Sequence, residues 1–88
     1  MDPILPVLTI YSRPGCHLCD EMKSVVARVG RAVPLTLVEI DISNDPALEA
    51  MYGLEIPVLI VDGGKAAKYR IDEGALLRLL TARASSAD

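Results

Sequence analysis

The spacing of apolar residues changes along the chain, and each change marks the border of a predicted strand or helix. Residues 7–11 form an apolar run rich in strand-forming residues, which predicts a first strand. From residue 18 the apolar positions recur at helical spacing instead, and this predicts a helix from Cys16 to about Arg31, with Gly30 and Pro34 bracketing its end. The positions that carry the helical pattern are Leu18, Met22, Val25, Val26 and Val29.

Three more strands are expected from the later part of the sequence. Apolar segments predict strands over residues 35–42, 58–61 and 65–69. Asp62-Gly63-Gly64 stands between the last two and is a hairpin signal. These two strands are therefore expected to be antiparallel neighbours.

Two further helices are predicted from their end signals. Asp45 and Pro46 supply a cap and a first-turn proline for a short helix over residues 47–52, which Gly53 is expected to end. Asp72 is the expected cap of a last helix over about residues 73–82, followed by a frayed tail over 83–88. The residues assigned to the inner face of that last helix are Ala75, Leu76, Leu79 and Leu80.

The resulting element order is β-α-β-α-β-β-α. Its first half alternates, which predicts parallel strands joined by a crossover helix, and its second half is a hairpin followed by a helix. The chain of 88 residues is therefore expected to form one α/β domain over 1–88 with a core over about 7–81. Its predicted architecture is a four-stranded mixed sheet flanked by helices.

Composition and charge exclude several classes of partner. The chain is 51% hydrophobic, has a net charge of −3, and contains three Tyr but no Phe or Trp. Because the net charge is negative and aromatic residues for base stacking are scarce, no nucleic-acid partner is expected. No apolar run approaches the roughly 20 residues of a membrane-spanning helix. Residues 1–6 contain two prolines and no basic stretch, so we expect no export signal and a reducing, cytoplasmic location.

The only two cysteines, Cys16 and Cys19, fall where the first strand hands over to the first helix. The unpaired N–H groups and partial positive charge of a helix N-terminus favour a thiolate over a thiol. Three residues of separation place the two sulfurs one helical turn apart, close enough for a disulfide. Cys-x-x-Cys in this setting predicts redox chemistry, and two inert buried cysteines are the alternative.

Two segments together resemble a known family. Residues 11–19, with Cys16 and Cys19, and residues 52–58, with Ile56 and Pro57, resemble the thioredoxin fold, and more narrowly the small bacterial glutaredoxin-like proteins. The likeness covers residues 7–81. It implies a thiol–disulfide oxidoreductase in which Cys16 is the nucleophile and Cys19 the resolving cysteine. It also implies that Pro57 is a cis proline facing the cysteines, and that the backbone at Ile56 pairs with an extended substrate.

The resemblance also implies partners. The expected substrates are proteins with a disulfide or mixed disulfides of glutathione, with the protein acting as a monomer in thiol-based electron transport. No cofactor or metal is expected, and glutathione is the co-substrate that the family suggests. The chain departs from the family at His17-Leu18, where Pro-Tyr or Pro-Phe is usual, and in residues 68–73, where only Asp72 keeps the usual glutathione-holding pattern of Gly-Gly followed by acids.

Four further residues are candidates for binding substrate. Arg13 could attract the thiolate or a glutathione carboxylate, or be a solvated turn residue. His17 could stabilise the Cys16 thiolate, or be an exposed turn residue. Arg70 and Asp72 could line a substrate groove, although a helix cap is the more ordinary role for Asp72.

Two other functions use the same sequence features. The first is a dimeric iron–sulfur or metal carrier, in which the two cysteines supply half of a four-thiolate shell and a second subunit or glutathione supplies the rest. His17 could then be a third ligand, although its position next to Cys16 strains that geometry. The second is a redox-inert interaction module.

Overall fold

The two strands in the interior of the sheet are its most apolar and most buried strands. The computed structural model describes residues 5–86, with the side chains of residues 5–82. The strands are Val7–Ser12 (β1), Thr36–Asp41 (β2), Val58–Val61 (β3) and Gly64–Lys68 (β4), and their order in the sheet is β2-β1-β3-β4. The strand β1 pairs in parallel with β2 and antiparallel with β3, and β3 pairs antiparallel with β4. These parallel and antiparallel pairings confirm the predicted four-stranded mixed sheet.

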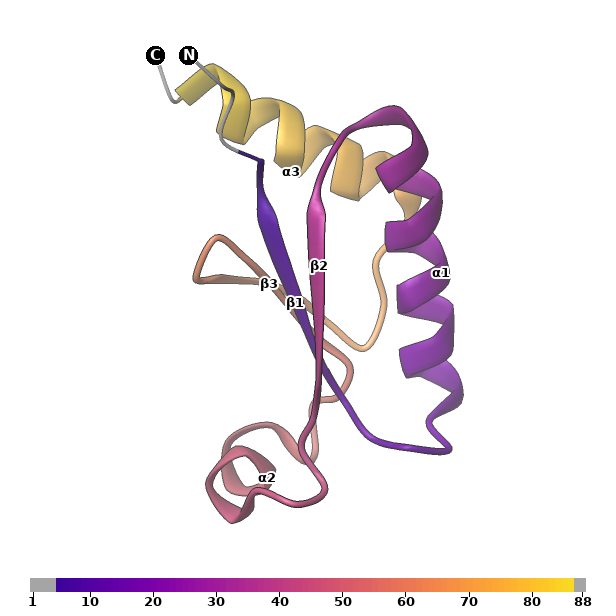
Figure 1. Ribbon diagram of the computed structural model, residues 1–88, viewed down its shortest axis with the longest axis vertical. Coiled ribbons are helices and arrows are strands. Elements are labelled where there is room, and N and C mark those ends of the chain that lie inside the picture. Colours follow the sequence, from indigo (N-terminus) through magenta and orange to yellow (C-terminus); the bar gives the residue numbers. More distant parts are fainter. Residues whose placement is uncertain (1–4, 87–88) are drawn as a thin grey trace.

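Three helices connect and cover these strands. Their bounds are His17–Ala32 for α1, Pro46–Tyr52 for α2 and Glu73–Ser86 for α3. Figure 1 shows α1 alongside the sheet and α3 near one end of the strands, with α2 beyond the other end. The helix α3 extends to Ser86, beyond its predicted end at about residue 82, because Ala and Arg are good helix formers. Residues 87–88 lie outside the described part of the chain.

The main core lies between one face of the sheet and the two longer helices. Side chains alternate between the faces of a strand, and Leu8 and Ile10 of β1 turn toward α1 and α3, as does Leu59 of β3. The helix α1 contributes residues at the helical spacing seen in the sequence, and α3 contributes two leucines. The helix residues buried in this core are Met22, Val26, Val29, Leu76 and Leu80.

The inner face of α3 differs from the prediction in one position. Leu76 and Leu80 are buried as expected, but Leu79 is 40% exposed. Leu77 is partly buried and packs against the core in its place. The apolar stripe of α3 is therefore rotated by part of a turn, because α3 packs against both α1 and the sheet.

The opposite face of the sheet is covered at one end by the short helix α2. Tyr52 of α2 stacks on Tyr11 of β1, with ring centroids 4.5 Å apart and planes 16° from parallel. Val58 lies in register with Tyr11 and is fully buried. The contact anchors α2 beside the loop that leads from β1 to the cysteines.

Candidate functional site

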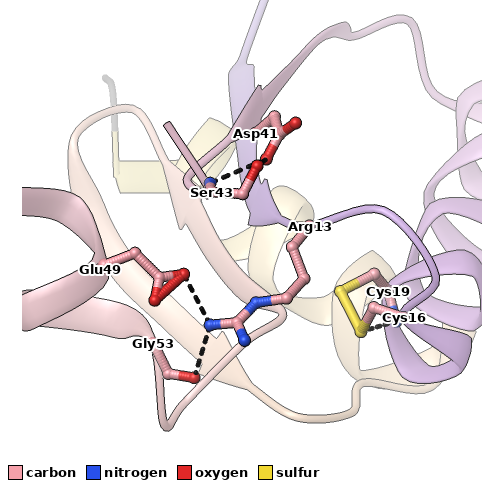
Figure 2. Close-up of polar contacts among 7 residues, drawn as sticks. All are labelled: Arg13, Cys16, Cys19, Asp41, Ser43, Glu49 and Gly53. Atoms are coloured by element: carbon pink, nitrogen blue, oxygen red, sulfur yellow. Dashed lines mark hydrogen bonds and ion pairs between the residues drawn. A yellow bond between two sulfur atoms is a disulfide. The ribbon is translucent and has the colours of Figure 1, made fainter. Parts of the chain in front are cut away.

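The two cysteines form a disulfide at the first turn of α1 (Figure 2), with their Cα atoms 5.2 Å apart. Cys16 is the N-cap of α1 and has an extended backbone, and its Sγ accepts a hydrogen bond from the Cys19 backbone N–H at 3.2 Å. Cys16 is partly exposed, whereas Cys19 is only 1% exposed. The two cysteines of the pair therefore differ in exposure, with Cys16 on the side open to solvent.

A short turn delivers Cys16 to this position. Gly15 has φ +77°, a left-handed conformation that residues with a side chain adopt at a cost. A Cβ at Gly15 would meet no atom within 4 Å, so the backbone conformation alone explains the glycine. The turn lets the chain leave β1 after the buried Ser12 and enter α1 with Cys16 as its cap.

The peptide bond between Ile56 and Pro57 is cis, which confirms that part of the prediction. Val58 lies opposite Tyr11 in the antiparallel register of β3 and β1. Pro57, just before β3, and the turn before Cys16, just after β1, therefore lie at the same end of the sheet. Pro57 is buried and Ile56 is partly exposed. The roles of Ile56 and Pro57 in substrate binding remain predictions.

Arg13 connects the turn before Cys16 to α2. Its Nη2 donates to Glu49 Oε1 at 2.7 Å and to the Gly53 carbonyl at 3.2 Å. Figure 2 shows the guanidinium turned toward Glu49 and Gly53, with the disulfide on the other side of the group. Arg13 therefore braces the loop against α2, a role that was not foreseen because its partners lie about 40 residues away.

A second polar anchor follows β2. Asp41 accepts hydrogen bonds from the Ser43 backbone N–H at 2.8 Å and from the Ser43 hydroxyl at 2.6 Å. These bonds, and more weakly the positive charge of Arg13, lower the pKa of the Asp41 carboxyl below its ordinary value of 3.8. The turn that leads from β2 to α2 is therefore held best when Asp41 is ionised.

This arrangement predicts a specific dependence of stability on pH. A carboxyl with a lowered pKa in the folded state stabilises the protein above its ordinary pKa, and that contribution is lost as the pH falls through the folded-state value. The difference in free energy of unfolding between wild type and Asp41→Asn should therefore be largest near neutral pH and shrink below pH 3.8. Urea unfolding between neutral and acid pH measures it. The partner variant Ser43→Ala should flatten the dependence only in part, because it removes the hydroxyl bond to Asp41 and keeps the bond from the backbone N–H. A difference that stays constant with pH would contradict the assignment.

The other candidate residues lie around the first turn of α1 and the segment before α3. His17 Nε2 lies 3.0 Å from Glu21 Oε2 and its side chain is 88% exposed, so the imidazole is directed along the surface of α1. Asp72 Oδ1 accepts from the Ala75 backbone N–H at 2.7 Å, which confirms its role as a helix cap. Arg70 and Asp72 both line a groove beside α1, together with Tyr69, which the sequence analysis had not singled out.

The described residues offer little support for a metal site within one chain. Among residues 5–86, no three His, Cys, Asp or Glu side chains gather in a metal-binding group. His17 therefore does not complete a three-ligand set with the cysteines. In the same part of the chain, none of the helices has the length and apolar character needed to cross a membrane.

Comparisons with known proteins place these features in context. The family model described as "Glutaredoxin-like domain (DUF836)" matches residues 7–81, which include both cysteines and Pro57. The X-ray structure of target protein XcR50 from X. campestris is 37% identical, with 85% of this chain and 96% of that chain covered and a TM-score of 0.74. The solution structure of protein Ne2328 from Nitrosomonas europaea is 25% identical, with 90% and 95% covered and a TM-score of 0.77.

A more distant neighbour identifies the fold. Chloroplastic thioredoxin z is 14% identical, with 88% of this chain and 76% of that chain covered and a TM-score of 0.70. At this identity the likeness concerns the fold alone. The four-stranded mixed sheet with three helices is therefore a thioredoxin-type α/β fold.

Proposed function

Since the chain belongs to the glutaredoxin-like domain family, we propose that it is a thiol–disulfide oxidoreductase that works through Cys16 and Cys19. Fold, family and the Cys-x-x-Cys pair together support a redox function in general. The observation that carries the specific proposal is the asymmetry of the disulfide. Cys16 is partly exposed at the helix N-terminus, and Cys19 is buried one turn later.

The proposed reaction begins with the reduced protein. The Cys16 thiolate attacks one sulfur of a substrate disulfide, forms a mixed disulfide, and releases the other substrate sulfur as a thiolate. Cys19 loses its proton and attacks Cys16 Sγ, which forms the Cys16–Cys19 disulfide and releases the second substrate thiolate. The substrate gains two electrons and the protein loses two. One of the two protons that the substrate thiolates take up comes from Cys19, and the other comes from the solvent, which received it when Cys16 ionised.

The N–H groups at the start of α1 explain why Cys16 would be the attacking group. The Cys19 N–H already points at Cys16 Sγ, at 3.2 Å, and such a bond is stronger to a thiolate than to a thiol. Cysteines at helix N-termini have pKa values of about 3.5–7.5 instead of about 8.5. We expect the pKa of Cys16 to be lowered in the same way. Asp20 and Glu21, which follow in the same turn, act in the opposite direction.

The proposed partners follow from this chemistry. They are polypeptides with an accessible disulfide and mixed disulfides of glutathione. The protein is proposed to react with them as a monomer in the cytoplasm. A thiol donor, either glutathione or a reductase, would return the electrons. The dithiol itself holds the two electrons, so the proposal needs no further cofactor.

Redox titration combined with a reduction assay tests the proposal. The protein is equilibrated in buffers of reduced and oxidised glutathione, and free thiols are alkylated and counted by mass spectrometry. We expect a two-electron transition between the dithiol and the Cys16–Cys19 disulfide, faster alkylation of Cys16 than of Cys19, and catalysis of insulin reduction by dithiothreitol. Cysteines that titrate independently, with no acceleration of insulin reduction, would refute the function.

A further inference from the structure

A groove with an apolar floor runs along α1 from the first turn of the helix. It has a volume of about 380 Å³ and lies between α1 and the segment that joins β4 to α3. Its floor is formed by side chains that are buried or half-buried and uncharged, namely Leu18, Met22, Val25 and Ile71. A concave apolar surface of this size is typical of a site that takes a side chain or a small ligand.

One end of the groove is formed by Leu18, the residue directly before Cys19 in the first turn of α1. Leu18 stands between the two cysteines in the sequence, and Met22 and Val25 follow it at helical spacing along the same side of α1. A substrate sulfur bonded to Cys16 therefore brings its neighbouring residues to the groove end at Leu18.

Tyr69 fixes the far wall of the groove. Its φ of +68° is uncommon for a residue with a large side chain and is held by two hydrogen bonds. The Tyr69 backbone N–H donates to the Pro57 carbonyl at 2.8 Å, and its hydroxyl donates to the Leu54 carbonyl at 3.0 Å. The wall is thus tied to the loop that passes through the cis proline, and the groove is formed before any substrate arrives.

The charged residues around the groove help to decide between glutathione and an apolar side chain as its occupant. The exposed rim carries the carboxylates of Glu21 and Asp72 and the guanidinium of Arg70. Glutathione is a small polar peptide with a net negative charge, and it offers no apolar side chain for the floor. An apolar side chain, in contrast, would remove the floor from water and would lie on its uncharged side chains.

We propose that this groove binds an apolar side chain next to the reactive cysteine of a polypeptide disulfide, so that such polypeptides react faster than glutathione adducts. The proposal rests on the dithiol exchange proposed above and specifies its substrate class. The chemistry is unchanged: Cys16 attacks the disulfide, and the groove holds the residue beside the attacked cysteine.

Single-turnover kinetics with matched substrates test the proposal. Reduced protein is mixed with disulfide-linked peptides that differ only in having Leu or Ser beside the cysteine, with glutathione disulfide, and with 2-hydroxyethyl disulfide. Burial of a leucine side chain corresponds to a rate advantage of about tenfold to a hundredfold for the Leu peptide over the Ser peptide. Val25→Asp, which places a charge on the floor, should bring that ratio close to one. Ala27→Asp adds the same charge to an exposed position of α1 outside the groove and should leave the ratio unchanged.

The outcomes separate this proposal from the proposed function. Equal rates for the Leu and Ser peptides with wild-type protein would overturn the groove assignment, and this arm needs no variant to fold. A ratio that survives in Val25→Asp, or a faster reaction with glutathione disulfide than with the Leu peptide, would overturn it as well. In each of these cases 2-hydroxyethyl disulfide still reacts with Cys16, whereas failure of the dithiol chemistry would abolish reaction with every substrate.

Discussion

Replacing Cys16 with serine is expected to reduce disulfide reductase turnover to the uncatalysed rate. The serine hydroxyl does not ionise near neutral pH and is a poor nucleophile toward sulfur, so the first exchange step is lost. Cys19 does not substitute for it, because its side chain is 1% exposed and a substrate disulfide cannot approach its sulfur in line. Reduction of insulin by dithiothreitol, measured with equal amounts of wild type and variant, provides the comparison.

Cys19→Ser is the matched variant and is expected to fail at the other step. Cys16 still attacks, but no internal thiol displaces the product, so a covalent complex with the substrate accumulates. Non-reducing electrophoresis and mass spectrometry should detect this complex for Cys19→Ser and not for Cys16→Ser.

Both cysteine variants lack the disulfide, so reduced wild-type protein is the proper reference for their folding. Matching circular dichroism and urea unfolding would show that the loss of activity comes from the missing sulfur. Substantial turnover by Cys16→Ser, or a trapped complex through Cys19 instead of Cys16, would reverse the proposed roles.

The sequence was sufficient for the features that depend on local patterns. The Cys-x-x-Cys position, the helical spacing of Met22, Val26 and Val29, and the hairpin signal before Gly64 all depend on residues close together in the chain. Each of them agrees with the structure. The cis bond before Pro57 was expected only through the family resemblance, because nothing in the nearby residues requires it.

Contacts between distant segments could not be predicted in this way. Arg13 and Glu49 are brought together only when α2 docks on the sheet through Tyr52, and a charge pair 36 residues apart leaves no local pattern. Tyr69 was assigned to the last strand, whereas it lies just beyond β4 with a left-handed backbone held by the loop before β3. Arg13 and Tyr69 both help to shape the surroundings of the disulfide. The sequence therefore predicted the reactive cysteines better than the residues that surround them.

The orientation of α3 is another feature set by tertiary packing, and it leads to a large expected effect on stability. Sequence spacing placed Leu76 and Leu79 on the same inner face, but in the structure Leu76 is fully buried and Leu79 is 40% exposed. Leu76→Ala should therefore lower the free energy of unfolding by about 2–5 kcal/mol, because it removes apolar contacts and leaves a cavity. For a domain of this size that is a large share of the total of about 5–15 kcal/mol.

Leu79→Ala makes the same chemical change one turn away on the same helix, so helix propensity cancels in the comparison. Its expected cost is below about 1 kcal/mol, since much of the side chain is already in water. Urea unfolding of both variants with the disulfide intact measures the difference, provided that the two m-values agree with wild type. Equal losses for the two variants would mean that Leu79 faces the core after all. α3 would then be rotated relative to the structure described here, and with it the packing of Leu77 and Leu80 against the sheet.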